Sequence, residues 1–197
     1  MEEANQKILS IVIMAHPDRR QMAEELALSL GGVPIVFDEV NNVWDTCRRA
    51  WQKIDKSAKY GLVLQDDVIV CRDFIRRAEA LLTGNFVYNF FVHYVFANRV
   101  NIALADGKRE FIRSTIASEV AICMPTKFIV SMINYCQKHK AKDDTLISSW
   151  ALSKRIWVCY PIPSLCDHRA GESVFLKHTG RPQRGGSHCS CCFADNF

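Results

Sequence analysis

The sequence lacks the features that mark membrane, secreted or repetitive proteins. No apolar run approaches the ~18 residues needed to cross a bilayer. The first residues, M-E-E-A-N-Q-K, are acidic and polar, so they do not form a signal peptide or a transit peptide. Internal repeats and Gly/Ser-rich linkers are also missing. We therefore expect a cytoplasmic protein.

A disulfide framework is also not indicated. The nine cysteines are odd in number, and several, such as Cys47, Cys123 and Cys159, lie within apolar patterns where a free thiol behaves as a small hydrophobe. A reduced compartment explains them better. The tail S-H-C-S-C-C (187–192) could hold zinc in a nucleic-acid-binding module, but it has no C-x₂-C pair followed by a second such pair. We expect residues 181–197 to form a flexible tail.

The first half of the chain alternates between two kinds of hydrophobic pattern. At 197 residues, with 49% hydrophobic and 23% charged residues, the chain is long enough to form one domain with a core. Strands separated by helices predict a mostly parallel sheet with helices on both faces. The expected strands are 7–15, 33–38 and 60–64, and the expected helices are 20–30, 44–54 and 72–82.

The second half is less regular. Residues 85–96 are rich in aromatic and β-branched side chains, and a short strand is expected at 120–124. A helix with proline at its start follows at 125–136. Another helix at 142–153 begins with acidic residues, and a strand is expected at 155–161. The alternation of strands and helices thus continues beyond the first half.

Two adjacent carboxylates, Asp66 and Asp67, follow the apolar strand in the stretch Y-G-L-V-L-Q-D-D-V-I-V. Ligands of open α/β sheets bind beyond the carboxyl ends of the strands. Adjacent carboxylates repel each other, and a cation such as Mn²⁺ or Mg²⁺ offsets this repulsion with oxygen ligands. The pair could instead cap the following helix or simply be solvated at the end of the strand.

The order of these elements, together with L-V-L-Q-D-D-V, resembles the nucleotide-sugar-binding half of GT-A glycosyltransferases, nearest to small bacterial and phage types that include lipopolysaccharide-modifying enzymes. The resemblance implies a single-domain GT-A (Rossmann-like) fold, with a nucleotide-sugar half at about 7–94 and an acceptor half at about 95–180. It also implies that Asp67 binds a divalent metal directly and that Asp66 contacts the metal through water or touches the donor ribose. Gln65 stands where many relatives carry an acid, which leaves the metal fewer carboxylates.

The segment A-K-D-D-T-L-I-S-S-W-A-L-S-K-R-I-W-V-C-Y-P-I-P-S-L-C-D-H is similar to the acceptor-side signature of small inverting members of this superfamily. In that signature an acid begins a helix, a strand follows, and the segment ends in P-S-L-x-x-H. The resemblance implies that Asp144, or its rival Asp143, is the general base, and that His168 completes the metal shell. For the two aspartates, a favourable place at a helix N-terminus is the structural alternative, and His168 could be a surface or capping residue.

The resemblance also implies an activity, namely inverting transfer of a sugar from a UDP-sugar, which we expect to be UDP-glucose, to an acceptor hydroxyl. Donor contacts are expected where the first and second strands end. The residues concerned are His16, Pro17, Arg19 and Asp38, joined by Asp66. Each of the loop residues could equally be solvated.

The charge distribution bears on the acceptor. The net charge of +4 combines −2 for residues 1–94 (11 basic, 13 acidic) with +6 for residues 95–197 (14 basic, 8 acidic). A basic half suits an anionic partner. We expect double-stranded phage DNA with hydroxymethylated bases, modified in the host cytoplasm, and lipopolysaccharide or another saccharide is the alternative. If a base must flip out, a stacking face could come from Phe90, Phe91, Tyr94 or Trp157.

Two other functions compete with this interpretation. I-V-I-M-A-H-P-D-R-R resembles the opening of zinc-dependent N-acetylglucosamine deacetylases, which read A-H-P-D-D-E. Arg19 and Arg20 stand where the two acids should be, and no later H-x-x-H pair supplies further ligands. A non-catalytic binder of sugar nucleotides is also possible, because fold does not determine function.

Overall fold

The structure is a computed structural model that describes residues 6–93, 96–106, 112–114, 120–139, 143–169, 190 and 192–196. For residues 112, 113, 143, 144 and 196 it describes the backbone alone. Within these ranges, none of the helices has both the length and the apolar character that crossing a membrane requires.

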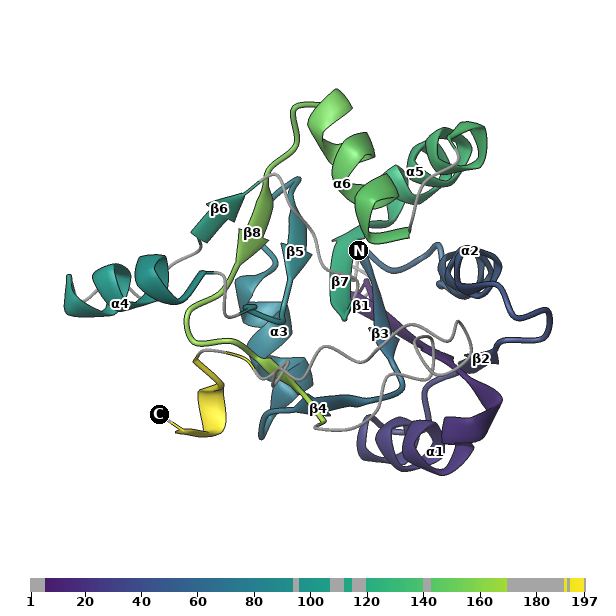
Figure 1. Ribbon diagram of the computed structural model, residues 1–197, viewed down its shortest axis with the longest axis horizontal. Helices are drawn as coiled ribbons and strands as arrows, with labels where there is room; N and C mark the ends of the chain where they lie inside the picture. The colour runs from purple at the N-terminus through teal and green to yellow at the C-terminus, as the bar shows by residue number, and fades with distance from the viewer. Residues whose placement is uncertain are drawn as a thin grey trace, which may run out of the picture.

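The secondary structure follows the predicted alternation through the first half and continues it in the second (Figure 1). The helices are α1 Arg20–Ser29, α2 Val43–Lys53, α3 Phe74–Leu81, α4 Ala97–Ala105, α5 Thr126–Lys138 and α6 Asp143–Ser153, with short 3₁₀ turns at Pro17–Arg19 and Ala194–Asn196. The strands are β1 Leu9–Ala15, β2 Ile35–Phe37, β3 Tyr60–Gln65, β4 Val68–Val70, β5 Val87–Asn89, β6 Ile112–Ser114, β7 Ala121–Pro125, β8 Val158–Tyr160 and β9 Cys166–His168.

One main sheet runs through both halves of the chain, in the order β2-β1-β3-β7-β5-β8-β6. Strands β2, β1, β3, β5 and β8 point the same way, while β7 and β6 run antiparallel to their neighbours. Strand β7, from the predicted acceptor half, lies between β3 and β5, which both belong to the predicted nucleotide-sugar half. The predicted mostly parallel sheet with flanking helices is confirmed.

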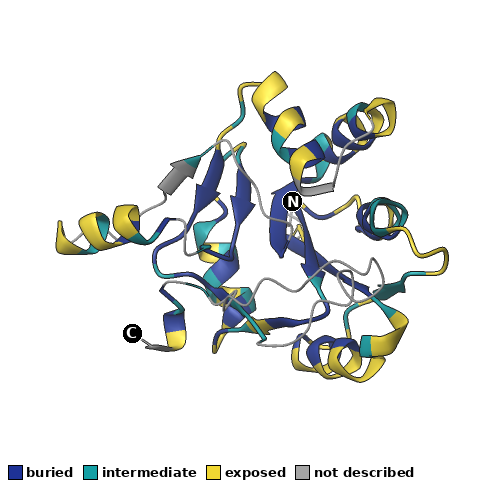
Figure 2. Ribbon diagram, in the orientation of Figure 1, coloured by how far each residue is buried: buried dark blue, intermediate teal, exposed yellow. Residues whose placement is uncertain are grey.

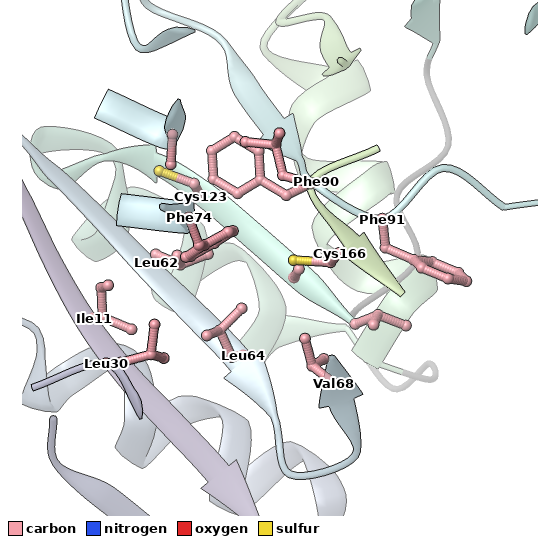
Figure 3. Close-up of a cluster of buried hydrophobic side chains, with 14 of the residues drawn as sticks. Ile11, Leu30, Leu62, Leu64, Val68, Phe74, Phe90, Phe91, Cys123 and Cys166 are labelled. Carbon is pink, nitrogen blue, oxygen red and sulfur yellow. The ribbon is translucent and has the colours of Figure 1, made fainter. Parts of the chain in front are cut away.

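Helices α1 and α3 cover one face of the main sheet. The apolar cluster on that face includes Leu30 from the end of α1 and Phe74 from α3, packed with Ile11, Leu62 and Leu64 of the strands (Figure 3). Every residue of β1 is buried, as expected of a strand with helices on both faces. The alternating side chains of β1 and β3 therefore supply both layers of the core.

Helices α2, α5 and α6 pack over the opposite face. Trp51 and Trp150, from α2 and α6, are fully buried there with Val12, Val63 and Met132. Figure 2 shows the buried centre of the sheet and the exposed outward sides of these helices. The helix predicted at 44–54 is confirmed as α2, and Cys47, Trp51 and the Ile54 that follows it are buried.

Local signals set the ends of the two N-terminal helices. Gly31 and Gly32 follow α1 with φ of 85° and 81°, a left-handed conformation that ends helices and that glycine adopts without strain. The side chain of Asn42 accepts a hydrogen bond from the Asp45 backbone N–H (3.1 Å) and caps α2. These caps fix where the chain leaves each helix to enter the next strand.

A second, small sheet pairs β4 with β9 in antiparallel register, with Val68 opposite His168. The sequence analysis did not predict β4 and placed a helix soon after the aspartates. Val68 and Cys166 of this small sheet join the cluster on the α1/α3 face (Figure 3). The small sheet is therefore anchored in the core rather than lying free on the surface.

Residues 192–196, within the segment expected to be flexible, are held against the core. The backbones of Ser164 and of residues 192–194 exchange two hydrogen bonds, Ser164 N to Cys192 O at 2.7 Å and Ala194 N to Ser164 O at 2.8 Å. The Asp195 carboxylate accepts hydrogen bonds from the Arg72 backbone N–H at 3.1 Å. Residues 181–189 lie outside the described part of the chain.

Candidate functional site

The residues predicted to form the site come together at one edge of the main sheet. Met14 pairs with Gln65 and Ala15 pairs with Phe37, so β1, β2 and β3 end level with one another. His16, Asp38 and the Asp66–Asp67 pair are the residues that follow these strands. The carboxyl ends of the strands are thus where the sequence predicted a ligand to bind.

Asp66 and Asp67 are both buried, each with a relative exposure of 5%. One carboxylate oxygen of Asp66, Oδ2, accepts a hydrogen bond from the His16 backbone N–H at 2.8 Å. The other, Oδ1, lies 3.1 Å from Nη1 of Arg19, and the same Nη1 contacts Oδ2 of Asp67. One guanidinium nitrogen therefore bridges the two carboxylates.

His168 reaches Asp67 because β9 pairs with β4. This pairing is extended by a hydrogen bond from the Arg169 backbone N–H to the Asp67 carbonyl oxygen at 2.8 Å. Nε2 of His168 lies 3.2 Å from Oδ2 of Asp67, and Nδ1 lies 3.0 Å from the Arg169 carbonyl oxygen. The carbonyl oxygen and the carboxylate oxygen are both acceptors, so in this structure both ring nitrogens are placed to donate, and Nε2 would lose its proton on binding a metal. Metal-binding histidines are commonly oriented in this way.

Burial and mutual charge shape the protonation of this cluster. Burial raises the pKa of Asp66 above its usual range, and the charge of Asp67 adds to the effect. Burial acts in the same direction on Asp67, but the hydrogen bond and charge of His168, with those of Arg19, hold its pKa below the usual range. Burial opposes the charged form of His168, but Asp67 raises the pKa of the imidazole. Asp67 is thus the carboxylate that ionises more readily.

The chemistry of these groups fits a divalent cation. Among the described residues, no group of three or more His, Cys, Asp or Glu side chains is placed so that it could hold a metal ion without rearrangement. Oδ1 of Asp67, however, is buried without a hydrogen-bond donor among those residues. Asp66, Asp67 and His168 present oxygen and nitrogen ligands that Mn²⁺ accepts. The fit requires that the Arg19 guanidinium leave the two carboxylates.

The other predicted donor contacts have local roles in this structure. Pro17 begins the 3₁₀ turn that carries Arg19. Oδ1 of Asp38 accepts hydrogen bonds from the Val40 and Asn42 backbone N–H groups, at 3.1 and 3.2 Å, and so shapes the loop that leads to α2. Contacts of these residues with a donor remain predictions.

The predicted general base lies at the edge of what the structure describes. Asp143 and Asp144 begin α6, as predicted, but their side chains are outside the described part of the chain. Their catalytic role therefore stays a prediction. Of the cysteines proposed for a zinc-binding tail, Cys192 is buried against the core, while Cys189 and Cys191 are outside the described residues.

Two features of the site were not predicted from the sequence, namely strand β4 and the contact of Arg19 with the acidic pair. Strand β4 was signalled only by V-I-V after the aspartates, a run too short to stand out from the helix expected beyond it. Arg19 was assigned to donor phosphate, yet here it neutralises the acidic pair. The buried adjacent carboxylates were themselves the signal for such a partner, because buried charges are almost always paired.

A basic groove lies apart from this cluster, along α5 and the end of α6. It is shallow, with a volume of about 570 Å³. Three exposed lysines, Lys127, Lys138 and Lys154, line it with polar and apolar neighbours. The predicted excess of positive charge in the second half is thus partly gathered on one surface.

Comparisons with known proteins report on the fold. No protein-family model matches the chain, and no curated protein matches it. Among solved structures, Drosophila β1,4-galactosyltransferase 7 superposes with a TM-score of 0.50 at 10% identity, covering 95% of this chain and 78% of that one. The 4-diphosphocytidyl-2C-methyl-D-erythritol synthase of Anaerococcus prevotii also superposes with a TM-score of 0.50, at 8% identity, and the match covers 89% of this chain and 96% of that one. A197 from STIV superposes with a TM-score of 0.50 at 12% identity, covering 82% of this chain and 86% of that one.

The chain has a GT-A-type α/β fold. The identities are low, so what these structures share with the chain is the fold. The GT-A-type fold predicted from the order of elements is confirmed, and the acidic pair stands at the sheet edge where ligands of such folds bind.

Proposed function

We propose that this protein transfers a sugar from a nucleotide-sugar donor to an acceptor hydroxyl. The observation that carries the proposal is the convergence of Asp66, Asp67 and His168 at the carboxyl edge of the sheet. Burying two carboxylates beside an imidazole is energetically unfavourable, and such clusters of ionisable groups are typical of functional sites. In a chain with a GT-A-type fold, that function would be to hold a divalent cation that binds the diphosphate leaving group.

The donor is proposed to lie over the ends of β1, β2 and β3. Asp67, Asp66 and His168 would hold the Mn²⁺ or Mg²⁺, which neutralises the charge that develops on the departing diphosphate. His16, Pro17 and Asp38 flank this place and would contact the nucleotide, and Arg19 would pair with phosphate. The Drosophila structure holds manganese and UDP-Gal, which supports a UDP-sugar here. UDP-glucose remains our proposed donor.

The acceptor hydroxyl needs a base within hydrogen-bond reach during attack. Asp144 is proposed for this role, with Asp143 as the rival, because both begin α6. A base that activates the acceptor for a single displacement implies inversion at the anomeric carbon. Replacement of Asp144 by Asn should abolish turnover and spare donor binding, whereas loss of both would point to a structural role.

An anionic acceptor is proposed from the charge of the second half and from the basic groove. Double-stranded DNA with hydroxymethylated bases remains the proposed acceptor, and a lipopolysaccharide or other saccharide is the alternative. The xylobiose in the Drosophila structure favours the saccharide. Of the aromatic residues considered for stacking, Phe90 and Phe91 belong to the core and Tyr94 lies outside the described residues, which leaves Trp157, 47% exposed.

A second candidate is nucleotidyl transfer. The likeness to the Anaerococcus prevotii synthase is as close as the likeness to the galactosyltransferase, with a TM-score of 0.50 in both cases. The released product separates the two reactions. Transfer of a sugar releases a nucleoside diphosphate from a nucleotide-sugar, whereas transfer of a nucleotide releases pyrophosphate from a nucleoside triphosphate.

The test is to incubate the protein with Mn²⁺, a UDP-sugar and one acceptor at a time, either hydroxymethylated duplex DNA or an oligosaccharide. We expect UDP release and an acceptor whose mass has grown by one hexose. Asp67→Asn should abolish both, and Arg20→Gln, a charge change next to the cluster, should not. No product with UDP-glucose, UDP-galactose or UDP-N-acetylglucosamine on either acceptor would reject the proposal. Pyrophosphate release from CTP or UTP with a sugar phosphate would establish the second candidate.

A further inference from the structure

Arg19 occupies the place between the two aspartates that a cation would take. Its Nη1 is within hydrogen-bond distance of Oδ1 of Asp66 and in contact with Oδ2 of Asp67. The side chains involved are largely shielded from water, with exposures of 16% for Arg19 and 7% for each aspartate. The pair is therefore charge-compensated from within the chain.

A second cation cannot share these oxygen atoms with Arg19. The guanidinium and a divalent ion carry like charges, and at a separation of a few ångströms in a buried site their repulsion is strong. Arg19 and the ion would also compete for the same lone pairs. The presence of Arg19 at these two oxygen atoms therefore weakens the binding of an ion to the pair.

The place of Arg19 in the fold permits it to leave. It ends the Pro17–Arg19 turn, which contributes no buried residue to the core, and Pro17, Asp18 and Arg20 around it are exposed. Rotation of the side chain therefore breaks contacts with the carboxylates without opening the core. By contrast, Asp66 and Asp67 directly follow β3 and His168 ends β9, so strand pairing holds the backbone next to all three.

We propose that Arg19 is an exchangeable counter-cation: it neutralises Asp66 and Asp67 in the ligand-free protein and gives up this place to a divalent cation as the donor binds. The proposal rests on the proposed function for the identity of the donor. Once displaced, the guanidinium would lie beside the incoming diphosphate, a group that it binds through two parallel hydrogen bonds. Metal binding without nucleotide is then opposed by the protein itself.

The test measures Mn²⁺ affinity directly, from the electron paramagnetic resonance signal of free Mn²⁺, with no nucleotide present. Arg19→Gln removes the competing charge and is expected to bind Mn²⁺ about tenfold more tightly than the wild type. Arg20→Gln is the matched control, because it removes the same charge one residue away without touching the aspartates; its affinity should equal that of the wild type. Equal or weaker affinity in folded Arg19→Gln overturns the proposal.

Thermal unfolding gives an independent readout. Without metal, Arg19→Gln should melt below the wild type, because two buried carboxylates lose their counter-ion. Saturating Mn²⁺ should raise the melting temperature of the variant more than that of the wild type. If Arg19→Gln does not fold, Arg19→Lys serves instead. The lysine ammonium ends one bond short of Nη1, the single nitrogen through which Arg19 contacts both carboxylates. This variant should therefore bind Mn²⁺ more tightly than the wild type, and equal affinity overturns the proposal.

The nucleotide supplies the last arm of the experiment. UDP should increase the affinity of the wild type for Mn²⁺ by a larger factor than that of Arg19→Gln, because the variant has no guanidinium to displace. An equal factor in the two proteins contradicts the exchange. Failure of sugar transfer with every donor would reject the proposed function. It would not change the Mn²⁺ affinities of the wild type and Arg19→Gln measured without nucleotide, so a failure of the proposed function can be distinguished from a failure of the exchange.

Discussion

The acidic cluster and the basic groove hold their charges in opposite ways. At the end of β3, Asp66 and Asp67 are buried, and each oxygen but one has a partner. Along α5 and α6, Lys127, Lys138 and Lys154 stand in solvent. Buried charges require partners because the interior cannot replace the lost hydration, whereas exposed charges are stabilised and screened by water. A change of charge in the cluster should therefore alter both the stability of the fold and the binding of a ligand. The lysines of the groove should instead attract an anionic partner through the sum of their charges.

The largest effect is expected from breaking the cluster. Asp67→Asn removes the charge that pairs with Arg19 and His168, both largely shielded from water. Leaving these groups without their partner should lower the free energy of unfolding by about 3 kcal/mol. Urea denaturation of the full chain measures the change.

A matched control is available on α3. Asp73 pairs with Arg76 at 3.0 Å, but both side chains are exposed. Asp73 has a φ of 54°, which asparagine also tolerates, so Asp73→Asn changes the charge without backbone strain. Its effect should stay within about 0.5 kcal/mol. Similar losses in Asp67→Asn and Asp73→Asn would contradict the contrast between buried and exposed charge.

The contrast also shows what the sequence could predict. Strand β3 and its edge were evident because Y-G-L-V-L is a continuous apolar run that ends in two acids. The contacts that complete the cluster were not evident, because they join segments that are far apart in the sequence. Val68 pairs with His168, a hundred residues later, and Arg19 reaches Asp66 from the loop after β1. Local patterns record burial and turns, while such contacts depend on how the elements pack.

The second half was harder for the same reason. Among the described residues of the segment 85–96, only Val87–Asn89 form a strand. Phe90 and Phe91 instead fill the core on the α1/α3 face. Aromatic and β-branched residues favour both strands and cores, so composition alone did not separate the two. The segment Ala97–Ala105, now α4, was not predicted as a helix.

The next effect in size concerns metal binding. His168→Gln should weaken Mn²⁺ binding in the presence of UDP by about 10- to 100-fold, or ~1.4 to 2.7 kcal/mol, because the oriented Nε2 beside Asp67 is lost. Isothermal titration calorimetry measures the affinity. His139→Gln is the control, since His139 stacks on Tyr135 on α5, away from the cluster. Unchanged affinity in His168→Gln would remove the imidazole from the proposed ligands.

A loss of comparable size, in stability rather than in metal affinity, is expected at Ser164, a buried polar residue without charge. Its Oγ accepts a hydrogen bond from the Val92 backbone N–H at 3.0 Å and lies within donating distance of the Phe90 and Cys166 carbonyl oxygens. Ser164→Ala removes the contacts of this buried hydroxyl with the Val92 N–H and the two carbonyl oxygens, and should lower the free energy of unfolding by about 2 kcal/mol. Ser153→Ala, at an exposed helix end, should change it by no more than about 0.5 kcal/mol. Equal effects on urea denaturation would contradict this account.

The smallest effect on stability is expected at the groove. Replacing Lys127, Lys138 and Lys154 by Gln should change the free energy of unfolding by less than about 0.5 kcal/mol each, because all three are exposed. If the groove binds duplex DNA through phosphates, the slope of log affinity against log salt should fall by about 1 for each lysine removed. Fluorescence anisotropy with a labelled duplex measures that slope, and the same replacements at Lys53, Lys56 and Lys59 in the first half serve as the control. An identical slope in both triple variants would show that the groove does not bind the DNA. The buried cluster would remain the proposed site for the donor.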